Sequence, residues 1–229
     1  MMQQIKIGRL IQCTVVKFLP EPDSYLAVIN GTESLAYLPR KYASRQYREG
    51  SGTVAAVFLF DDGKTILSQR SPQYFRRIAE EILTPVIRDG RIRVRKAASV
   101  MNGPFAKVAI EGINGADPLN TCLPYLEKAK MYTDDTITIV RYSENIKEYI
   151  VNALVPAPAD KVLQVLYSHA LREAIVRVET PYCGYFVGKG GANVATAAKL
   201  INVKIAIKSA RQEVPADAQN GERYVRAHW

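Results

Sequence analysis

A stretch of three glycines around one lysine, Gly188-Lys189-Gly190-Gly191, has the residue types needed to bind a phosphate group. Glycine has no Cβ atom, so this backbone can approach a sugar-phosphate chain closely. The helix-forming residues 191–201 predict a helix whose free N-terminal amides would face the phosphate, and Lys189 would add a positive charge. The pattern therefore predicts contact with a phosphate-bearing partner.

Three phosphate-binding motifs can be tested against the spacing of these glycines. A Walker A loop is excluded, because Gly184 and Gly188 enclose three residues instead of four and Gly190 follows the lysine. A dinucleotide fingerprint is disfavoured, because its last position is Asn193 and the loop follows a predicted helix. A KH module, in which a GxxG loop joins two helices and clamps a few unpaired nucleotides, fits the spacing. A plain helix connector made of glycines remains the alternative.

Two further groups of residues could contact RNA. Polar and apolar residues alternate in residues 91–96, which places three arginines on one face of a predicted strand. This face would be either a basic track that contacts RNA or a strand face exposed only to solvent. Barrels that bind nucleic acid stack bases on surface aromatics, although aromatics on strands also occur in cores. The candidates are Arg91, Arg93 and Arg95 on the strand, and Phe18, Tyr25 and Tyr37 in the preceding β-rich region.

The composition favours a basic, globular protein with a polyanionic partner. The chain has 229 residues, of which 48% are apolar, and its 31 Lys and Arg against 22 Asp and Glu give a formal charge of +9. This length allows two or three compact units. The surplus charge is typical of nucleic-acid binding, although some basic enzymes share it.

The sequence offers no pattern for a metal, a cofactor or catalysis. Its three cysteines form no CxxC pair, and neither of its two histidines has a second ligand at metal spacing. Ser168-His169 lacks a third partner, so we expect no enzymatic activity and no small-molecule substrate. The longest apolar run, residues 54–60, is too short to span a membrane, and residues 1–16 lack the apolar segment of a signal peptide, so we expect a cytoplasmic protein.

The elements that must position these residues form three predicted units. Residues 8–69 contain five short β-rich runs separated by turn signals, which predict a small OB-type barrel; a β-sandwich fragment is the alternative. The remainder predicts the order helix, strand, strand, helix, helix, strand twice, which indicates an internal structural repeat. The predicted domains are a barrel (1–70), a first repeat (71–142), a second repeat (143–209) and a flexible tail (210–229), in an α+β multidomain fold.

Four segments resemble the family of the bacterial transcription factor NusA. GKGGANVATAAKLINVKIAI (188–207) resembles the second KH module of that family, and ITIVRYSENIKEYIVNALVPA (137–157) resembles the segment that joins its two KH modules. AYLPRKY and ILSQRSPQYFRRI resemble the end of its barrel and its first KH helix. The resemblance extends over roughly residues 7–208.

The resemblance implies an OB-type barrel of the ribosomal-protein-S-one type followed by two tandem prokaryotic-type (type II) KH domains. It implies single-stranded RNA binding in transcription elongation, termination or antitermination, with RNA polymerase or ribosomal proteins as further candidate partners. The RNA-binding candidates that it marks are Gly188, Lys189, Gly190, Gly191 and Asn193.

Two features depart from the family pattern. Pro124-Tyr125-Leu126-Glu127 stands where the first KH module should have its GxxG loop, so we expect that copy to be structural or to bind weakly. Because the predicted barrel begins within ten residues of Met1, we expect the family's N-terminal polymerase-binding domain to be missing. The substitution at residues 124–127 favours an alternative hypothesis, an adapter that docks on polymerase or ribosomal components with little specific RNA binding.

Overall fold

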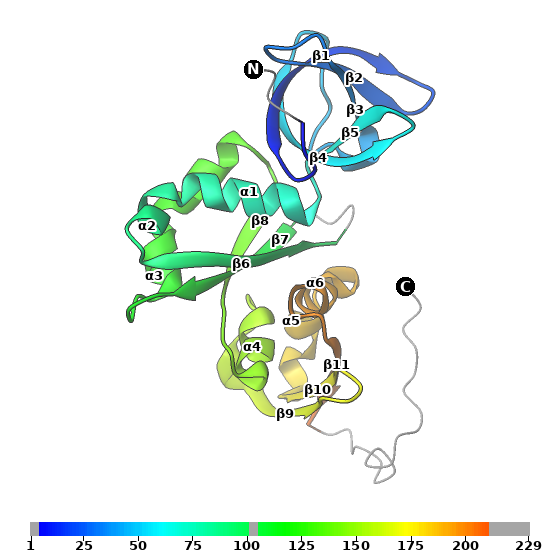
Figure 1. Cartoon of the computed structure of the whole chain (residues 1–229). Helices are drawn as coiled ribbons and strands as arrows, with labels where there is room; N and C mark the ends of the chain where they lie inside the picture. Colours follow the sequence, from blue (N-terminus) through cyan, green and yellow to red (C-terminus); the bar gives the residue numbers. More distant parts are fainter. Residues whose placement is uncertain (1–4, 101–104, 211–229) are drawn as a thin grey trace.

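A computed structural model describes residues 5–100 and 105–210 of the chain. It contains a closed barrel and two three-stranded sheets, each with its own helices (Figure 1). The dipeptide Asn102-Gly103, which the sequence predicts to be a turn, and the predicted tail beyond residue 210 lie outside these ranges. Within them, no helix is long and apolar enough to cross a membrane.

The first unit is a five-stranded barrel with the neighbour order β1-β2-β3-β5-β4, closed by pairing of β1 with β4. Alternate residues of β1, among them Cys13 and Val15, point into the core, as period-two strands require. Because the sheet closes on itself, the OB-like barrel is confirmed and the sandwich alternative is wrong. The strands are β1 (Leu10–Leu19), β2 (Ser24–Ile29), β3 (Leu35–Pro39), β4 (Gly52–Asp61) and β5 (Lys64–Ser68), with a 3₁₀ turn η1 (Arg40–Tyr42) after β3.

The first α/β unit carries a mixed sheet of order β6-β7-β8, with β6 and β7 antiparallel and β7 and β8 parallel. Its first helix begins at Pro72, because the Ser71 side chain accepts a hydrogen bond from the Tyr74 amide and proline is favoured in the first turn. The elements are α1 (Pro72–Ile82), α2 (Thr84–Arg88), β6 (Ile92–Ser99), β7 (Phe105–Gly112), α3 (Pro118–Cys122), η2 (Leu123–Met131) and β8 (Thr136–Arg141). Helix α2 was not expected, because one turn is too short to show a period.

The second α/β unit repeats this order around a sheet of order β11-β10-β9, again with one antiparallel and one parallel pair. Apart from α2, the two units share the order helix, strand, strand, helix, helix, strand that the sequence predicts. The elements are α4 (Ile146–Ala153), η3 (Ala159–Lys161), β9 (Val162–Ser168), β10 (Glu173–Val178), η4 (Thr180–Tyr182), α5 (Cys183–Val187), η5 (Lys189–Gly191), α6 (Ala192–Ile201) and β11 (Lys204–Ser209).

The two α/β units share a hydrophobic core. Ala98, Ala109 and Val140 of the first sheet belong to the same buried cluster as residues of α4 and α6. The first sheet is therefore covered by α1 on one face and by α6 on the other (Figure 1). Strand β7 is consequently buried on both faces, which explains why its sequence FAKVAI lacks alternation.

Candidate nucleic-acid interface

The glycine loop, residues 188–191, joins α5 to α6 with a backbone that only glycine adopts readily. Gly188, Gly190 and Gly191 have φ values of 75°, 58° and 77°. Side chains with a Cβ atom are disfavoured at positive φ, so the backbone itself requires these glycines. Gly191 is the N-cap of α6, and the exposed Lys189 lies between the glycines. The loop thus presents a cation beside the start of a ten-residue helix.

The glycines of the loop have different surroundings. A Cβ atom on Gly188 would lie 2.6 Å from the Cβ of Asn193 and 2.9 Å from its amide nitrogen, so this position is closed by the protein. No atom lies within 4 Å of a Cβ atom placed on Gly190 or Gly191. The first glycine therefore allows internal packing, whereas the last two leave open space for an approaching chain.

Asn193 is turned into the protein, which corrects the prediction that it contacts RNA. It is only 4% exposed. Its Nδ2 donates to the backbone oxygens of Leu154 and Phe186 at 2.9 and 3.0 Å, and its Oδ1 accepts from Lys107 Nζ at 2.5 Å. Asn193 therefore holds the glycine loop against α4 and the first sheet, and its side chain is not free to bind a ligand.

Lys107 of β7 was not identified from the sequence, although a lone charge inside an unbroken apolar strand was a usable signal. The side chain is fully buried. Its Nζ donates to the backbone oxygens of Ala153 and Val155 as well as to Asn193. Burial lowers the pKa of Lys107 to about 7. A residue of the first α/β unit thus contacts the anchor of the glycine loop in the second.

Two tyrosines next to the glycine loop were also missed. Tyr185 on α5 is 68% exposed, and its ring centroid lies 6.1 Å from that of Tyr182. Lys161 Nζ lies 5.3 Å from the Tyr182 centroid. An exposed aromatic ring beside a phosphate-binding loop can stack on a base, so Tyr185 joins the candidate interface.

The corresponding segment of the first α/β unit has a different backbone. Residues 124–127 lie within the 3₁₀ segment η2, and none of them has a positive φ. The ring of Tyr125 is covered by Lys128, whose Nζ lies 5.4 Å from the ring centroid. This segment therefore lacks the open glycine backbone of residues 188–191.

The arginine face of β6 is exposed but partly neutralised. Arg93 and Arg95 point away from the core, and each guanidinium lies about 3.5 Å from the carboxylate of Glu111. Arg95 also lies over the ring of Tyr142, 4.5 Å from its centroid. The third arginine, Arg91, is exposed and donates to Thr121 Oγ1 at 3.5 Å. Shared acceptors weaken the attraction of this face for phosphate.

The three barrel aromatics do not form one stacking surface. Tyr25 is 3% exposed and packs edge-on against Tyr47, so the prediction that Tyr25 stacks on a base is wrong. Phe18 is exposed, with its ring centroid 5.1 Å from that of Tyr25. Tyr37 is half-buried, and Lys64 Nζ lies 5.9 Å from its centroid. Phe18 and Tyr37 therefore remain accessible candidates.

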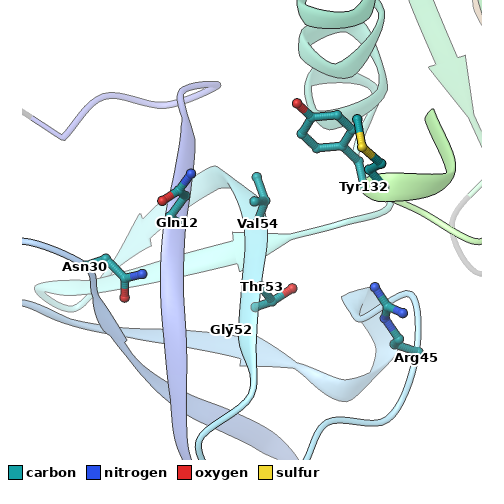
Figure 2. A pocket seen from close by; sticks show the side chains of 8 residues that line it. Gln12, Asn30, Arg45, Gly52, Thr53, Val54 and Tyr132 are labelled. Carbon is teal, nitrogen blue, oxygen red and sulfur yellow. The ribbon is translucent and has the colours of Figure 1, made fainter. Parts of the chain in front are cut away.

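A pocket of about 260 Å³ lies between the barrel and the first α/β unit, away from the residues predicted from sequence. Figure 2 shows Gln12, Thr53 and Val54 on neighbouring strands of the barrel, with Tyr132 on the first α/β unit. Amide, hydroxyl and guanidinium groups beside an apolar wall can hold a planar polar group such as a base. The lining residues are Gln12, Asn30, Arg45, Gly52, Thr53, Val54, Met131 and Tyr132.

The pocket is bordered by contacts that fix the barrel on the first α/β unit. Arg45 of the barrel pairs with Asp134 of the first α/β unit at 3.9 Å, while within that unit the Tyr74 hydroxyl donates to the Tyr132 backbone oxygen at 2.5 Å. Arg70 and Asp135 form a second pair at 3.7 Å, where burial raises the pKa of the Asp135 carboxyl. Within residues 5–100 and 105–210, no group of three or more His, Cys, Asp or Glu side chains could hold a metal ion.

The structure thus defines an OB-like barrel followed by further mixed α/β units, with an open glycine loop on the last of them. The chain is 31% identical over 187 residues to the transcription termination/antitermination protein NusA of Halalkalibacterium halodurans, covering 77% of this chain and 48% of that protein. It is 30% identical over 149 residues to NusA of Bacillus subtilis, covering 62% and 39%. The resemblance to NusA that the motifs indicate is confirmed.

These matches cover only part of each relative. The chain spans about half the length, or less, of the curated relatives that it matches. No family model matches it. Among solved structures, the crystal structure of APE1850 aligns with 15% identity and a TM-score of 0.39, covering 60% of this chain and 97% of that chain, which is too low to support an argument.

Proposed function

We propose that this protein binds single-stranded RNA through the glycine loop and acts, like the NusA proteins that it resembles, in transcription elongation, termination or antitermination. The observation that carries the proposal is the open, positive-φ backbone at Gly190 and Gly191, next to the exposed Lys189. The names of the relatives support the role in transcription.

In this proposal the two α/β units are type II KH domains, with limits near residues 71–142 and 143–209, and residues 1–70 form the ribosomal-protein-S-one-type barrel. The support is the repeated element order and the position of the glycine loop between α5 and α6. The first KH domain carries residues 124–127 in place of a GxxG loop. It acts mainly as a support for the second domain, with which it shares a core.

Each part of the interface has a distinct physical role. The backbone at Gly190 and Gly191 admits the sugar-phosphate chain, the free amides at the start of α6 donate to phosphate, and Lys189 adds a screened charge. Tyr185 stacks on an unpaired base. The barrel assists through Phe18, Tyr37 and the pocket beside Arg45, and Arg91, Arg93 and Arg95 add a weaker basic track.

The test is fluorescence-polarisation binding to a pool of short single-stranded RNAs over a salt series. Gly190→Asp places a carboxylate at the open tip and should abolish binding, while circular dichroism stays unchanged. Gly115→Asp is the matched control, because Gly115 also has a positive φ and open space, at a turn between β7 and α3. Equal binding by both variants and wild type would reduce the loop to a helix connector.

A second candidate function, docking on a protein partner, is favoured by two exposed apolar side chains. Leu123 and Met131, at the two ends of η2, are 67% and 70% exposed. Binding of purified RNA polymerase should be compared between wild type and a Leu123→Lys variant, because Met131 also lines the pocket that is proposed to assist RNA binding. Loss of polymerase binding with RNA affinity retained would establish an adapter surface, and unchanged binding would exclude this surface.

A further inference from the structure

We propose that Lys107 is a positioning residue for the glycine loop, so that the loop which the second α/β unit presents to RNA is set by both units together. The proposal rests on the proposed function for its affinity readout. It explains why a charged side chain occupies the most buried strand of the first sheet.

The surroundings of Lys107 match an ammonium group. Its three N–H bonds face three acceptors: the backbone oxygens of Ala153, the last residue of α4, and of Val155, just beyond it, and the side-chain oxygen of Asn193, in α6. A fully buried lysine is costly unless each donor has a partner. Here all three partners belong to the second unit, whereas Lys107 belongs to the first. The side chain therefore ties the two units at one point.

Asn193 connects Lys107 to the glycine loop. Because Nδ2 donates to the Leu154 and Phe186 backbone oxygens, the Asn193 amide joins α4, α5 and α6. Asn193 also packs against Gly188 so closely that no Cβ atom fits there. The Gly191 amide in turn donates to the Gly188 oxygen at 3.0 Å. A rotation of the Asn193 amide would break its hydrogen bond to Phe186, in the last turn of α5, and would therefore free the segment that leads into Gly188 and the open tip.

Lys107 Nζ also orients this amide. As a donor to Oδ1, it requires that Asn193 present its oxygen toward β7 and its NH₂ toward the two carbonyls. Without that donor, Asn193 Oδ1 would lose its hydrogen-bond partner in a buried site, and the amide would gain by rotating toward another donor. The arrangement of the loop thus depends on a residue that RNA does not touch.

The chain offers a matched control at the same interface. Lys96 of β6 also reaches across it, because its Nζ donates to the backbone oxygen of Lys199 in α6 at 3.1 Å. Lys96 is exposed and does not contact Asn193. Lys107→Met and Lys96→Met therefore both remove an ammonium group between the units, but only the first removes the donor to Asn193.

The experiment compares wild type, Lys107→Met and Lys96→Met in the full chain, under conditions where near-ultraviolet circular dichroism shows each to be folded. The readouts are the Kd for short single-stranded RNA and the ¹⁵N–¹H resonances of Gly188, Gly190 and Gly191. Lys107→Met should weaken RNA binding about tenfold, within the range of coupling between contacting residues, and should shift the loop resonances. Lys96→Met should leave the Kd within about twofold and the loop resonances in place.

A purely structural lysine would lower the unfolding midpoint but leave the folded protein's Kd and loop resonances unchanged, and that result would overturn the proposal. If Lys107→Met does not fold, Lys107→Gln, which retains two N–H donors, replaces it. In wild type, RNA should also shift the buried Asn193 side-chain amide resonance, and an unmoved resonance in a saturated complex would count against the proposal. If wild type binds no RNA, the proposed function fails alone, because the loop resonances still report on Lys107.

Discussion

Gly188→Ala should be the most destabilising single-methyl substitution in the glycine loop. Gly188 has φ 75° and ψ 170°, a conformation that is almost restricted to glycine and costs other residues about 1–3 kcal/mol. The added Cβ atom would also lie 2.6 Å from the Asn193 Cβ, and overpacking of this kind costs about 1–3 kcal/mol more. The expected loss of stability is therefore about 2–6 kcal/mol.

Gly190→Ala is the matched comparison. Gly190 has φ 58° and ψ 25°, which lies in the left-handed helical region, and its Cβ atom would meet open space. Only the conformational cost of about 1–2 kcal/mol applies. The difference between the two variants therefore combines the contact of Gly188 with Asn193 and the larger conformational cost at Gly188.

The assay is native-state hydrogen exchange of α6 amides, which reads the opening free energy of this unit without assuming that the whole chain unfolds in one step. Gly188→Ala should lower the opening free energy more than Gly190→Ala does. If the two variants lose equal stability, the contact between Gly188 and the backbone and Cβ of Asn193 is not as close as described.

Three further predictions concern charge and aromatic contacts. Lys189→Ala should lower the slope of log K against log salt by about 0.7 if the lysine neutralises one phosphate, and an unchanged slope would remove it from the interface. The pKa of Lys107 is about 7 in the folded protein, against the ordinary value of 10.5 in the unfolded protein. Below pH 7 the Lys107 amine is therefore protonated in both the folded and the unfolded state. Between pH 7 and 10.5 the unfolded state binds more protons. Stability should therefore rise with pH there by up to about 1.4 kcal/mol per unit, and this rise should vanish in Lys107→Met when chemical denaturation is followed. Tyr25→Ala should cost about 3–5 kcal/mol of stability by leaving a core cavity. Phe18→Ala should leave stability unchanged and weaken RNA binding by about 1–3 kcal/mol. If calorimetry and binding titrations show instead that Phe18→Ala lowers stability and Tyr25→Ala weakens RNA binding, the assignment of Tyr25 to the core and Phe18 to the interface is wrong.

Local patterns in the sequence determined most of the element order. The five β-rich runs, the two repeats and the glycine loop could be predicted because turn residues, hydrophobic periods and glycine spacing act over a few residues. The charge surplus indicated a polyanionic partner, and the motifs at residues 137–157 and 188–207 indicated the resemblance to NusA. Helix α2 was missed because one turn of helix carries no measurable period.

Only the tertiary structure decided which side chains face outward. Asparagine and tyrosine side chains bind RNA where they are exposed. Asn193 and Tyr25 are instead buried, because each packs against elements that are distant in the sequence. In the barrel, a bulge between Val15 and Lys17 interrupts the alternation of inward and outward side chains along β1. A strict period of two therefore does not predict whether Phe18 faces the core or the solvent.

The contact between Lys107 and Asn193 joins residues 86 positions apart, and the pocket beside Arg45 lies between two units. Spacing along the chain specifies a local backbone, whereas the pairing of buried polar groups depends on which elements pack together. For that reason the sequence located the glycine loop, and the fold alone showed what holds it in place.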